Sequence, residues 1–213
     1  NLFGNTVDYD RFTMTSEFFN SDLKVIEDAA QSFGASYRGR PSGSLGDISV
    51  LSFDPTKNLN NYGSGGMVLV DDLATANRIM DLRDNGKKLD HENPGTNSKM
   101  SEVDCAQMMV KTQYIDAWQE RRMKISLHWM ERLKGTGIRT LIDSNNFATH
   151  AFHKFVIEID NRDAVKKALA DRKIETKVHY ERPLHELEGV FKKYPGPGML
   201  AAASSFSRRV LFR

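Results

Sequence analysis

Three short apolar segments, each followed by a polar loop, constrain the fold of this chain more than any other feature. They cover residues 24–28, 48–53 and 66–70, with the sequences KVIED, ISVLSF and GMVLV. These runs are short, and their apolar residues show little alternation with polar ones. That pattern is typical of strands buried on both faces of a mostly parallel sheet, so we predict an α/β fold.

Helical periodicity is predicted in two places downstream of these segments. Apolar residues near helical spacing over 73–83 indicate one helix. A longer helical region is predicted over 100–133, with Ser101 as its N-cap. The residues that mark one face of this region are Val103, Ala106, Met109, Val110, Tyr114, Ile115 and Trp118.

The sequence pattern changes after the long helical region, and we interpret the change as a domain boundary. Residues 152–159 and 174–180 are predicted to be strands that flank an amphipathic helix over 162–172. Such a strand–helix–strand set indicates a second, smaller α/β domain. We therefore assign residues 1–125 to a large domain and residues 126–213 to a small C-terminal domain.

The composition gives no support to nucleic-acid or membrane binding. The net charge is only +2, and acidic and basic residues are interspersed rather than clustered. No apolar run approaches the length of a membrane span. The single cysteine, Cys105, excludes an internal disulfide and a zinc site built from cysteines, so a reducing, cytoplasmic setting is expected.

Both ends of the chain are expected to be cut from a longer protein. The first residue is Asn1 rather than an initiator methionine. The last residues, 207–213 (SRRVLFR), are expected to stop without a finishing secondary-structure element, and some of them are interpreted as junction sequence. We therefore treat the chain as a fragment truncated at both ends.

Charged side chains follow two of the predicted strands. Glu27 and Asp28 end the first strand, and Lys57 lies in the polar loop after the second. In open α/β sheets, ligands collect outside the carboxyl ends of the strands. A lysine amine there is a useful nucleophile toward carbonyl groups, and the surrounding loop can bind an anion. Taken alone, these residues predict only an α/β domain with a crevice suited to anions.

Motifs at defined spacing narrow this interpretation. They lie at residues 27–35 (EDAAQSFGA), 43–47 (GSLGD), 52–59 (SFDPTKNL), 63–67 (GSGGM), 95–102 (GTNSKMSE) and 174–185 (IETKVHYERPLH). In order and residue type this set resembles the sugar aminotransferase family named DegT/DnrJ/StrS. The resemblance implies the aspartate aminotransferase-like fold of enzymes that depend on pyridoxal 5'-phosphate. It also implies that residues 1–125 form part of the large, cofactor-binding domain.

The resemblance assigns roles to four residues of the first domain. Lys57 matches the lysine that holds the cofactor covalently and then moves a proton between substrate and cofactor. Asp28 matches the acid that pairs with the protonated pyridine nitrogen, which keeps the ring able to accept electrons. Gln31 matches a residue lying against the cofactor ring, and Ser52 matches a hydroxyl donor to the cofactor phosphate.

Other matching positions imply contacts farther from the cofactor ring. Asn97 and Lys99 fall in the segment that, in the family, reaches the phosphate region of the partner subunit's active site. His179, Tyr180 and His185 match residues expected near the sugar-nucleotide side.

The chain departs from the family pattern in several places. Asp54 stands where the family often has His, and we assign it no catalytic role. Lys99 stands where Arg or Asn is usual. The N-terminal part of the family, with its phosphate-binding turn and helix start, is expected to lie outside this sequence, as is the end of the small domain.

The leading hypothesis is transfer of an amino group, from glutamate, to a nucleotide-linked keto sugar in the biosynthesis of amino sugars for cell-surface polysaccharides or related products. The resemblance implies a homodimer with shared active sites. Two alternatives stay open: a regulatory relative without turnover, and a sugar dehydratase, for which His is expected in place of Lys57. No metal is expected, because His150 and His153 lack further ligands.

Overall fold

The computed structural model describes residues 1–19, 22–89, 93–142, 147–193 and 200–212. The chain divides into two compact units. Unit 1 comprises Asn1–Lys124 and Ser144–His153, and unit 2 comprises Ile125–Asp143 and Lys154–Arg213. Both units combine helices and strands, so the predicted α/β class is confirmed. Among the helices described, none has the length and apolarity needed to cross a bilayer.

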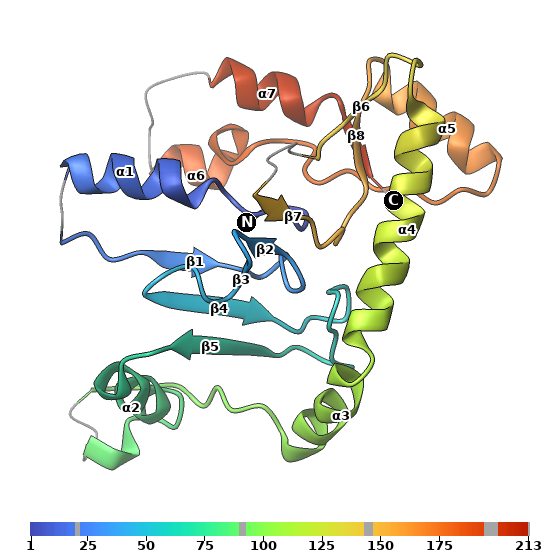
Figure 1. The fold of residues 1–213 in the computed structure, drawn as a ribbon. Helices are drawn as coiled ribbons and strands as arrows, with labels where there is room; N and C mark the ends of the chain where they lie inside the picture. The colour runs from blue at the N-terminus through green and yellow to red at the C-terminus, as the bar shows by residue number, and fades with distance from the viewer. Residues whose placement is uncertain (20–21, 90–92, 143–146, 194–199, 213) are drawn as a thin grey trace. The chain divides into compact units, whose positions relative to one another are not determined.

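The main sheet of unit 1 contains the three strands expected from the apolar segments. They are β1 (Ile26–Asp28), β4 (Ile48–Ser52) and β5 (Gly66–Val70), in the order β1-β4-β5. Figure 1 shows β1 and β4 running in the same direction and β5 in the opposite one.

Two details of the predicted sheet are wrong for these strands. β5 is antiparallel to β4, because the Phe53 N–H donates to the Gly65 carbonyl (2.8 Å) and the loop between the strands turns straight back. Burial on both faces is also absent from these strands, since β4 alternates between buried and partly exposed residues and β5 has no buried residue. Only one face of β4 is covered by the described residues of unit 1.

The core of unit 1 lies beneath the covered face of this sheet. Its buried members are Ala29, Leu51, Phe53, Leu59 and Met108. Two of them, Phe53 and Leu59, lie on either side of Lys57 in the sequence. The loop that carries the lysine is therefore attached to the core at both ends.

Unit 1 also contains elements that the apolar pattern did not predict. Helix α1 (Tyr9–Phe19) begins next to Asp8, whose carboxylate accepts the Arg11 N–H (3.1 Å). A small antiparallel sheet joins β3 (Arg40–Pro41), β2 (Ser36–Tyr37) and β7 (Ala148–Thr149).

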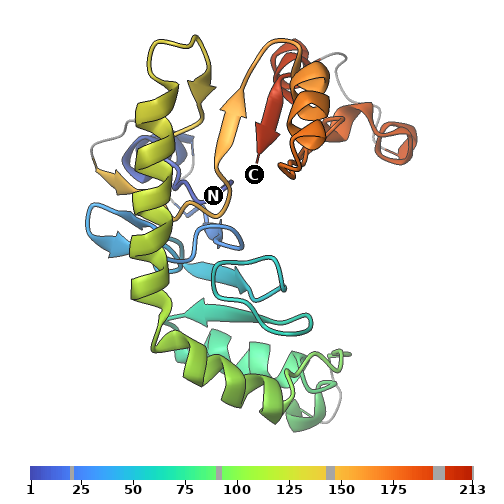
Figure 2. The same cartoon turned by 90° about the vertical axis from the view of Figure 1, so that its right-hand side faces the viewer.

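The helices predicted over 73–83 and 100–133 are present, with one break. α2 (Leu73–Leu82) is capped by Asp72. The region expected over 100–133 forms two helices, α3 (Glu102–Thr112) and α4 (Ile115–Leu133), and Figure 2 shows the change of direction between them. Ser101 caps α3 as predicted, by accepting the Asp104 N–H. The 3-10 turn η1 (Lys87–Leu89) lies between α2 and α3.

Unit 2 is built around an antiparallel sheet in the order β6-β8-β9. Its strands are β6 (Arg139–Thr140), β8 (Val156–Glu158) and β9 (Val210–Phe212). The predicted amphipathic helix is present as α5 (Arg162–Asp171). It is followed by η2 (Leu184–Glu186), α6 (Glu188–Lys193) and α7 (Ala201–Ser207).

Two predictions about unit 2 are wrong for one shared reason. The strand expected over 174–180 contributes only an isolated bridge between Lys177 and Phe212. The place beside β8 is taken instead by β9, whose three residues are all buried. The last residues therefore do carry a secondary-structure element, although Arg213 itself lies outside the described residues.

Candidate functional site

The register of β1 and β4 determines which side chains share a face of the sheet. The strands are parallel, with Glu27 opposite Ser49 and Asp28 opposite Val50. Successive side chains alternate between faces, and directly paired residues point the same way. Glu27 and Ser49 therefore lie on one face, whereas Asp28 and Ser52 lie on the other. Both strands end at the same edge of the sheet.

On the first of these faces, the side chain of Glu27 is buried and all its hydrogen bonds come from neighbouring residues of this chain. Its Oε2 accepts the N–H groups of Gly43 (2.9 Å) and Leu45 (3.0 Å) and the hydroxyl of Ser49 (2.9 Å). Its Oε1 accepts from the Ser42 hydroxyl and the Asn1 amide, both at 2.8 Å. Burial alone would raise the pKa of Glu27, but these hydrogen bonds hold the pKa below its usual value.

The opposite face carries Asp28, which is exposed in this chain. One carboxylate oxygen, Oδ1, accepts the Ala30 N–H at 3.0 Å. Within the described part of the chain, Oδ2 has no hydrogen-bond donor. Asp28 is thus held at the end of β1 by a local turn while half of its carboxylate stays available to a ligand.

Lys57 lies on the loop that leaves the same edge of the sheet after β4. A tight turn over 54–57 places it, since the Lys57 N–H donates to the Asp54 carbonyl at 2.9 Å. The Lys57 side chain is partly buried, and its ammonium group makes no hydrogen bond or ion pair with the described residues. The backbone turn therefore positions the amine, and no described side chain forms an ion pair with it.

Ser52 and Gln31 differ in which of their polar atoms already form hydrogen bonds. The Ser52 hydroxyl oxygen accepts the Asp54 N–H at 3.3 Å, which leaves its proton to be donated elsewhere. The Gln31 carbonyl oxygen accepts the Phe3 N–H at 2.9 Å, which fixes the side chain against the N-terminal segment. Only the amide NH₂ of Gln31 remains to face a ligand.

Asn58, next to the lysine, is a residue that the sequence analysis missed. Its side chain is buried and donates to the Ala151 carbonyl at 2.8 Å, with longer bonds to the Phe33 carbonyl and to Gln119 (both 3.4 Å). Because Asn58 follows Lys57 directly, these bonds anchor the carboxyl side of the lysine loop. In the sequence, the one feature that could have indicated this role is the position of a polar residue between the candidate lysine and the apolar Leu59.

Asn97 and Lys99 lie on a separate loop of unit 1. Asn97 forms a bridge with Asp84, and the Lys99 ammonium binds Asp84 Oδ1 at 2.7 Å. Both side chains are exposed. No contact joins this loop to Asp28 or Lys57 among the interactions of the described residues.

The three residues expected near the sugar nucleotide lie in unit 2. His179 stacks on Phe212 with ring centroids 4.5 Å apart, and Tyr180 is exposed. The His185 Nε2 lies 3.2 Å from the Ser204 hydroxyl. The structure therefore gathers the predicted cofactor residues in unit 1 and the predicted sugar residues in unit 2.

His150 and His153 are both engaged in the packing of unit 1. The His150 Nδ1 accepts the Phe152 N–H at 2.8 Å, and burial lowers the pKa of His150 to about 4. His153 is buried and close enough to Asp54 to affect the pKa of that carboxyl. Within the described ranges, no three His, Cys, Asp or Glu side chains are grouped closely enough to hold a metal ion.

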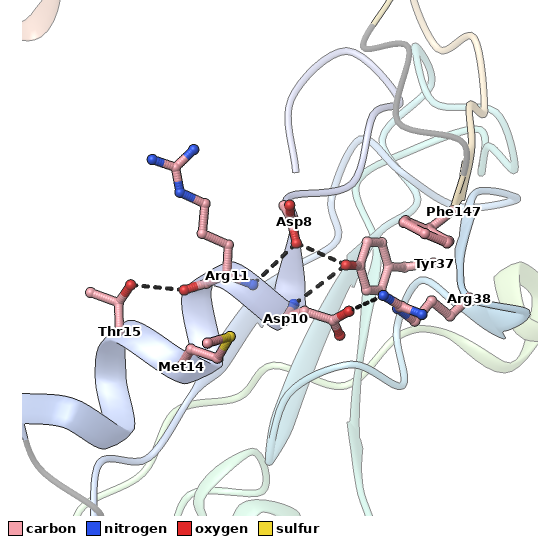
Figure 3. A pocket seen from close by; sticks show the side chains of 8 residues that line it. All are labelled: Asp8, Asp10, Arg11, Met14, Thr15, Tyr37, Arg38 and Phe147. Carbon is pink, nitrogen blue, oxygen red and sulfur yellow. Dashed lines mark hydrogen bonds and ion pairs between the residues drawn. The ribbon is translucent and has the colours of Figure 1, made fainter.

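A pocket of about 560 Å³ opens beside α1 in unit 1 (Figure 3). Its polar groups mostly satisfy one another. The Tyr37 hydroxyl donates to Asp8 (2.8 Å), Asp10 pairs with Arg38, and the Arg38 guanidinium lies over the Phe147 ring at 4.0 Å. In Figure 3 only the Arg11 guanidinium extends away from the rest. The pocket contains none of the predicted site residues.

Comparisons with known proteins agree with the motifs. The sequence pattern of the DegT/DnrJ/EryC1/StrS aminotransferase family matches residues 1–212. The chain is 34% identical over 212 residues to the "Erythromycin biosynthesis sensory transduction protein EryC1" of Saccharopolyspora erythraea, covering 99% of this chain and 57% of that protein. It is 33% identical over 213 residues to the dTDP-3-amino-3,4,6-trideoxy-alpha-D-glucose transaminase of Streptomyces venezuelae, covering 99% and 55%.

Solved structures give the same picture. The crystal structure of S. venezuelae DesV in complex with a ketimine intermediate matches with a TM-score of 0.91 at 33% identity, over 99% of this chain and 57% of that one. An aminotransferase from Brucella abortus matches with a TM-score of 0.90 at 30% identity, over 99% and 56%. The chain thus spans a little over half the length of these relatives.

Proposed function

The chain belongs to the DegT/DnrJ/EryC1/StrS aminotransferase family, and from this premise we propose that the protein is a pyridoxal phosphate-dependent aminotransferase. It transfers an amino group, from glutamate, to a keto sugar carried on a nucleotide, in amino-sugar biosynthesis in the cytoplasm. Relatives named as transaminases of nucleotide-linked sugars, from S. venezuelae and Aneurinibacillus thermoaerophilus, support this substrate class.

The observation that carries the proposal is the set of unused polar groups at one sheet edge. The cofactor needs an anion for its ring nitrogen, an amine for its aldehyde and donors for its phosphate. Asp28 offers an oxygen without a donor among the described residues, and Lys57 offers an amine without an acceptor among them. Ser52, on the same face as Asp28, offers a hydroxyl proton. The residues present therefore fit pyridoxal phosphate.

Each of these residues has a defined task in the proposed reaction. When bound, pyridoxal phosphate supplies an electron sink for the carbon that gains or loses the amino group. Asp28 holds the ring nitrogen protonated, since a carboxylate beside it favours the cation. Lys57 would hold the cofactor through Nζ, and the same amine would move a proton to and from the substrate carbon. Ser52 and Gln31 orient the phosphate and the ring.

The remaining assignments are part of the same proposal. Residues 1–125 belong to the large cofactor-binding domain and 126–213 to the small domain. His179, Tyr180 and His185 contact the sugar nucleotide. Asn97 and Lys99 act near the phosphate in a homodimer with shared sites, where Lys99 has to leave or share its bond with Asp84.

A regulatory role without turnover is the second candidate, because one relative carries the name of a sensory transduction protein. A regulator has no chemical need for an unpaired amine together with an open carboxylate at one sheet edge. A dehydratase is disfavoured by Lys57 itself.

The test is a transamination assay on the purified full-length protein. Pyridoxal phosphate, glutamate and a panel of nucleotide-linked keto sugars would be supplied, and 2-oxoglutarate and amino-sugar products would be measured. We expect turnover with at least one keto sugar and none after Lys57→Ala. Folded protein that binds no cofactor, or turnover that survives Lys57→Ala, would overturn the proposal.

A further inference from the structure

We propose that Asp54 is a positioning residue for Lys57: its carboxylate fixes the turn that presents the amine and supplies a permanent negative charge beside it. This inference rests on the proposed function, because it concerns the lysine that binds the cofactor. It assigns a task to the position at which the chain departs from the family pattern.

The first support is the density of hydrogen bonds around Asp54. Its Oδ1 accepts both the N–H (2.9 Å) and the hydroxyl (2.7 Å) of Thr56, which closes the turn from the side-chain direction. Its carbonyl accepts the Lys57 N–H (2.9 Å), which closes the same turn along the backbone. Pro55 lies between them and restricts φ to the range such a turn requires.

The turn is also tied to the strand before it and the loop after it. The Asp54 N–H donates to the Ser52 hydroxyl oxygen at 3.3 Å, and the Asn60 amide donates to the Pro55 carbonyl at 2.9 Å. Lys57 therefore starts from a backbone that is fixed on both sides, and its side chain supplies the remaining freedom.

The second support is charge. Hydrogen bonds from the Thr56 hydroxyl and N–H hold the pKa of Asp54 below its usual value, and the positive charge of the nearby Lys57 lowers it further. Asp54 is thus an anion throughout the neutral pH range. A fixed anion favours the protonated form of a nitrogen on which its charge acts. If Lys57 Nζ binds the cofactor as proposed, the Asp54 carboxylate would favour the protonated form of that nitrogen.

Substitutions separate the two effects. Asp54→Asn removes the charge but keeps a side-chain oxygen that can accept from Thr56. Thr56→Val removes one hydrogen bond of the turn and keeps the charge. Asp72→Asn is the matched control. Like Asp54, Asp72 accepts the N–H of a threonine that follows it closely in the sequence, here Thr75 at 2.7 Å. Asp72 follows β5, which is antiparallel to β4, and so lies beyond the opposite edge of the sheet from Lys57.

The experiment is a pH titration of the visible absorption band of the full-length protein loaded with pyridoxal phosphate. In Asp54→Asn we expect the midpoint of the titration to fall by about half a unit to one unit. Thr56→Val and Asp72→Asn are expected to leave the midpoint within about 0.2 units of the parent. Asp54→Ala is expected to lower the midpoint and also to weaken retention of the cofactor, because the turn loses its side-chain acceptor.

The outcomes distinguish this inference from the proposed function. A band that is absent from the parent protein, or that persists in Lys57→Ala, overturns the proposed function. A band that requires Lys57 but has the same midpoint in Asp54→Asn and Asp72→Asn overturns the role of Asp54 alone. Circular dichroism of each variant checks the fold, and if Asp54→Asn does not fold, Asp54→Ser provides a second neutral variant that keeps an acceptor oxygen.

Discussion

Glu27 and Asp28 are consecutive carboxylates on β1, and they face opposite sides of the same sheet. Glu27 is buried and accepts hydrogen bonds from Asn1, Ser42, Gly43, Leu45 and Ser49. The Asp28 side chain is exposed, and its carboxylate accepts one hydrogen bond from the described residues, that of the Ala30 N–H. The comparison teaches that donors, rather than residue type, separate a structural carboxylate from one that is available to a ligand.

The largest expected effect is on folding, from Glu27→Ala. Several buried donors would lose their acceptor, so the free energy of unfolding should fall by about 3–5 kcal/mol. Urea unfolding followed by circular dichroism measures the change. Glu27→Gln should cost less because its amide oxygen still accepts. A loss below about 1 kcal/mol for Glu27→Ala would contradict the structural role given to Glu27.

Asp28→Asn should have the reverse profile. The neutral amide no longer holds the cofactor nitrogen protonated, so turnover should fall by about 10²- to 10³-fold. The free energy of unfolding should stay within about 0.5 kcal/mol of the parent, as expected for an exposed side chain. Steady-state kinetics and urea unfolding on one preparation test both statements. Equal turnover in variant and parent would contradict the role of Asp28.

His150 differs from Glu27, although both are buried titratable groups. Burial shifts the pKa of His150, whereas hydrogen bonds outweigh burial in setting the pKa of Glu27. The pKa of His150 is about 4 in the folded chain against an ordinary value of 6.5. The unfolded chain therefore binds the proton more readily, so the contribution of His150 to stability is complete above pH 6.5 and is lost as the pH falls toward 4. The loss should be about 2–3 kcal/mol across that window.

His150→Asn should flatten the stability profile in this window, because it keeps an acceptor for the Phe152 N–H and removes the titration. Urea midpoints measured between pH 4 and 7 give the profile. Glu27 has a lowered pKa as well, so its contribution is present above its ordinary value and is lost only at lower pH. A variant with the same slope as the parent between pH 6.5 and 5 would show that His150 is not responsible.

The smallest expected effect comes from two serines of β4 that lie on opposite faces. Ser52→Ala should weaken binding of pyridoxal phosphate about five- to tenfold, which corresponds to one hydrogen bond of roughly 1 kcal/mol. Ser49→Ala should leave that affinity within about twofold and instead lower the free energy of unfolding by about 1–2 kcal/mol, since Glu27 loses a donor. Fluorescence titration with the cofactor measures both affinities. Equal losses of affinity in the two variants would show that the assignment of the serines to opposite faces is wrong.

Much of the fold followed from local sequence signals. The three apolar segments gave the strands β1, β4 and β5, and the serine at 101 and the periodicity over 162–172 gave a helix start and a helix. Strand direction did not follow, because it depends on the Phe53–Gly65 hydrogen bond between the two ends of a loop. The choice of β9 over 174–180 likewise depends on competition between two segments for one place beside β8.

The candidate site shows the same division. Asp28, Ser52 and Lys57 were assigned because the motifs that contain them resemble those of the family. The bonds of Asn58 to Ala151 and of Glu27 to the loop over 42–45 could not, since they join residues far apart in the sequence. The roles of Asp28, Ser52 and Lys57 remain predictions for the experiments above.

Covalent trapping shows directly whether Lys57 is the residue that binds the cofactor. The full-length protein is incubated with pyridoxal phosphate, reduced with borohydride, digested and analysed by mass spectrometry. We expect the reduced cofactor to be attached to Lys57, and we expect no label in Lys57→Ala on the peptide that contains this position. Label on a different lysine of the folded protein, with Lys57 unmodified, would contradict the role of Lys57.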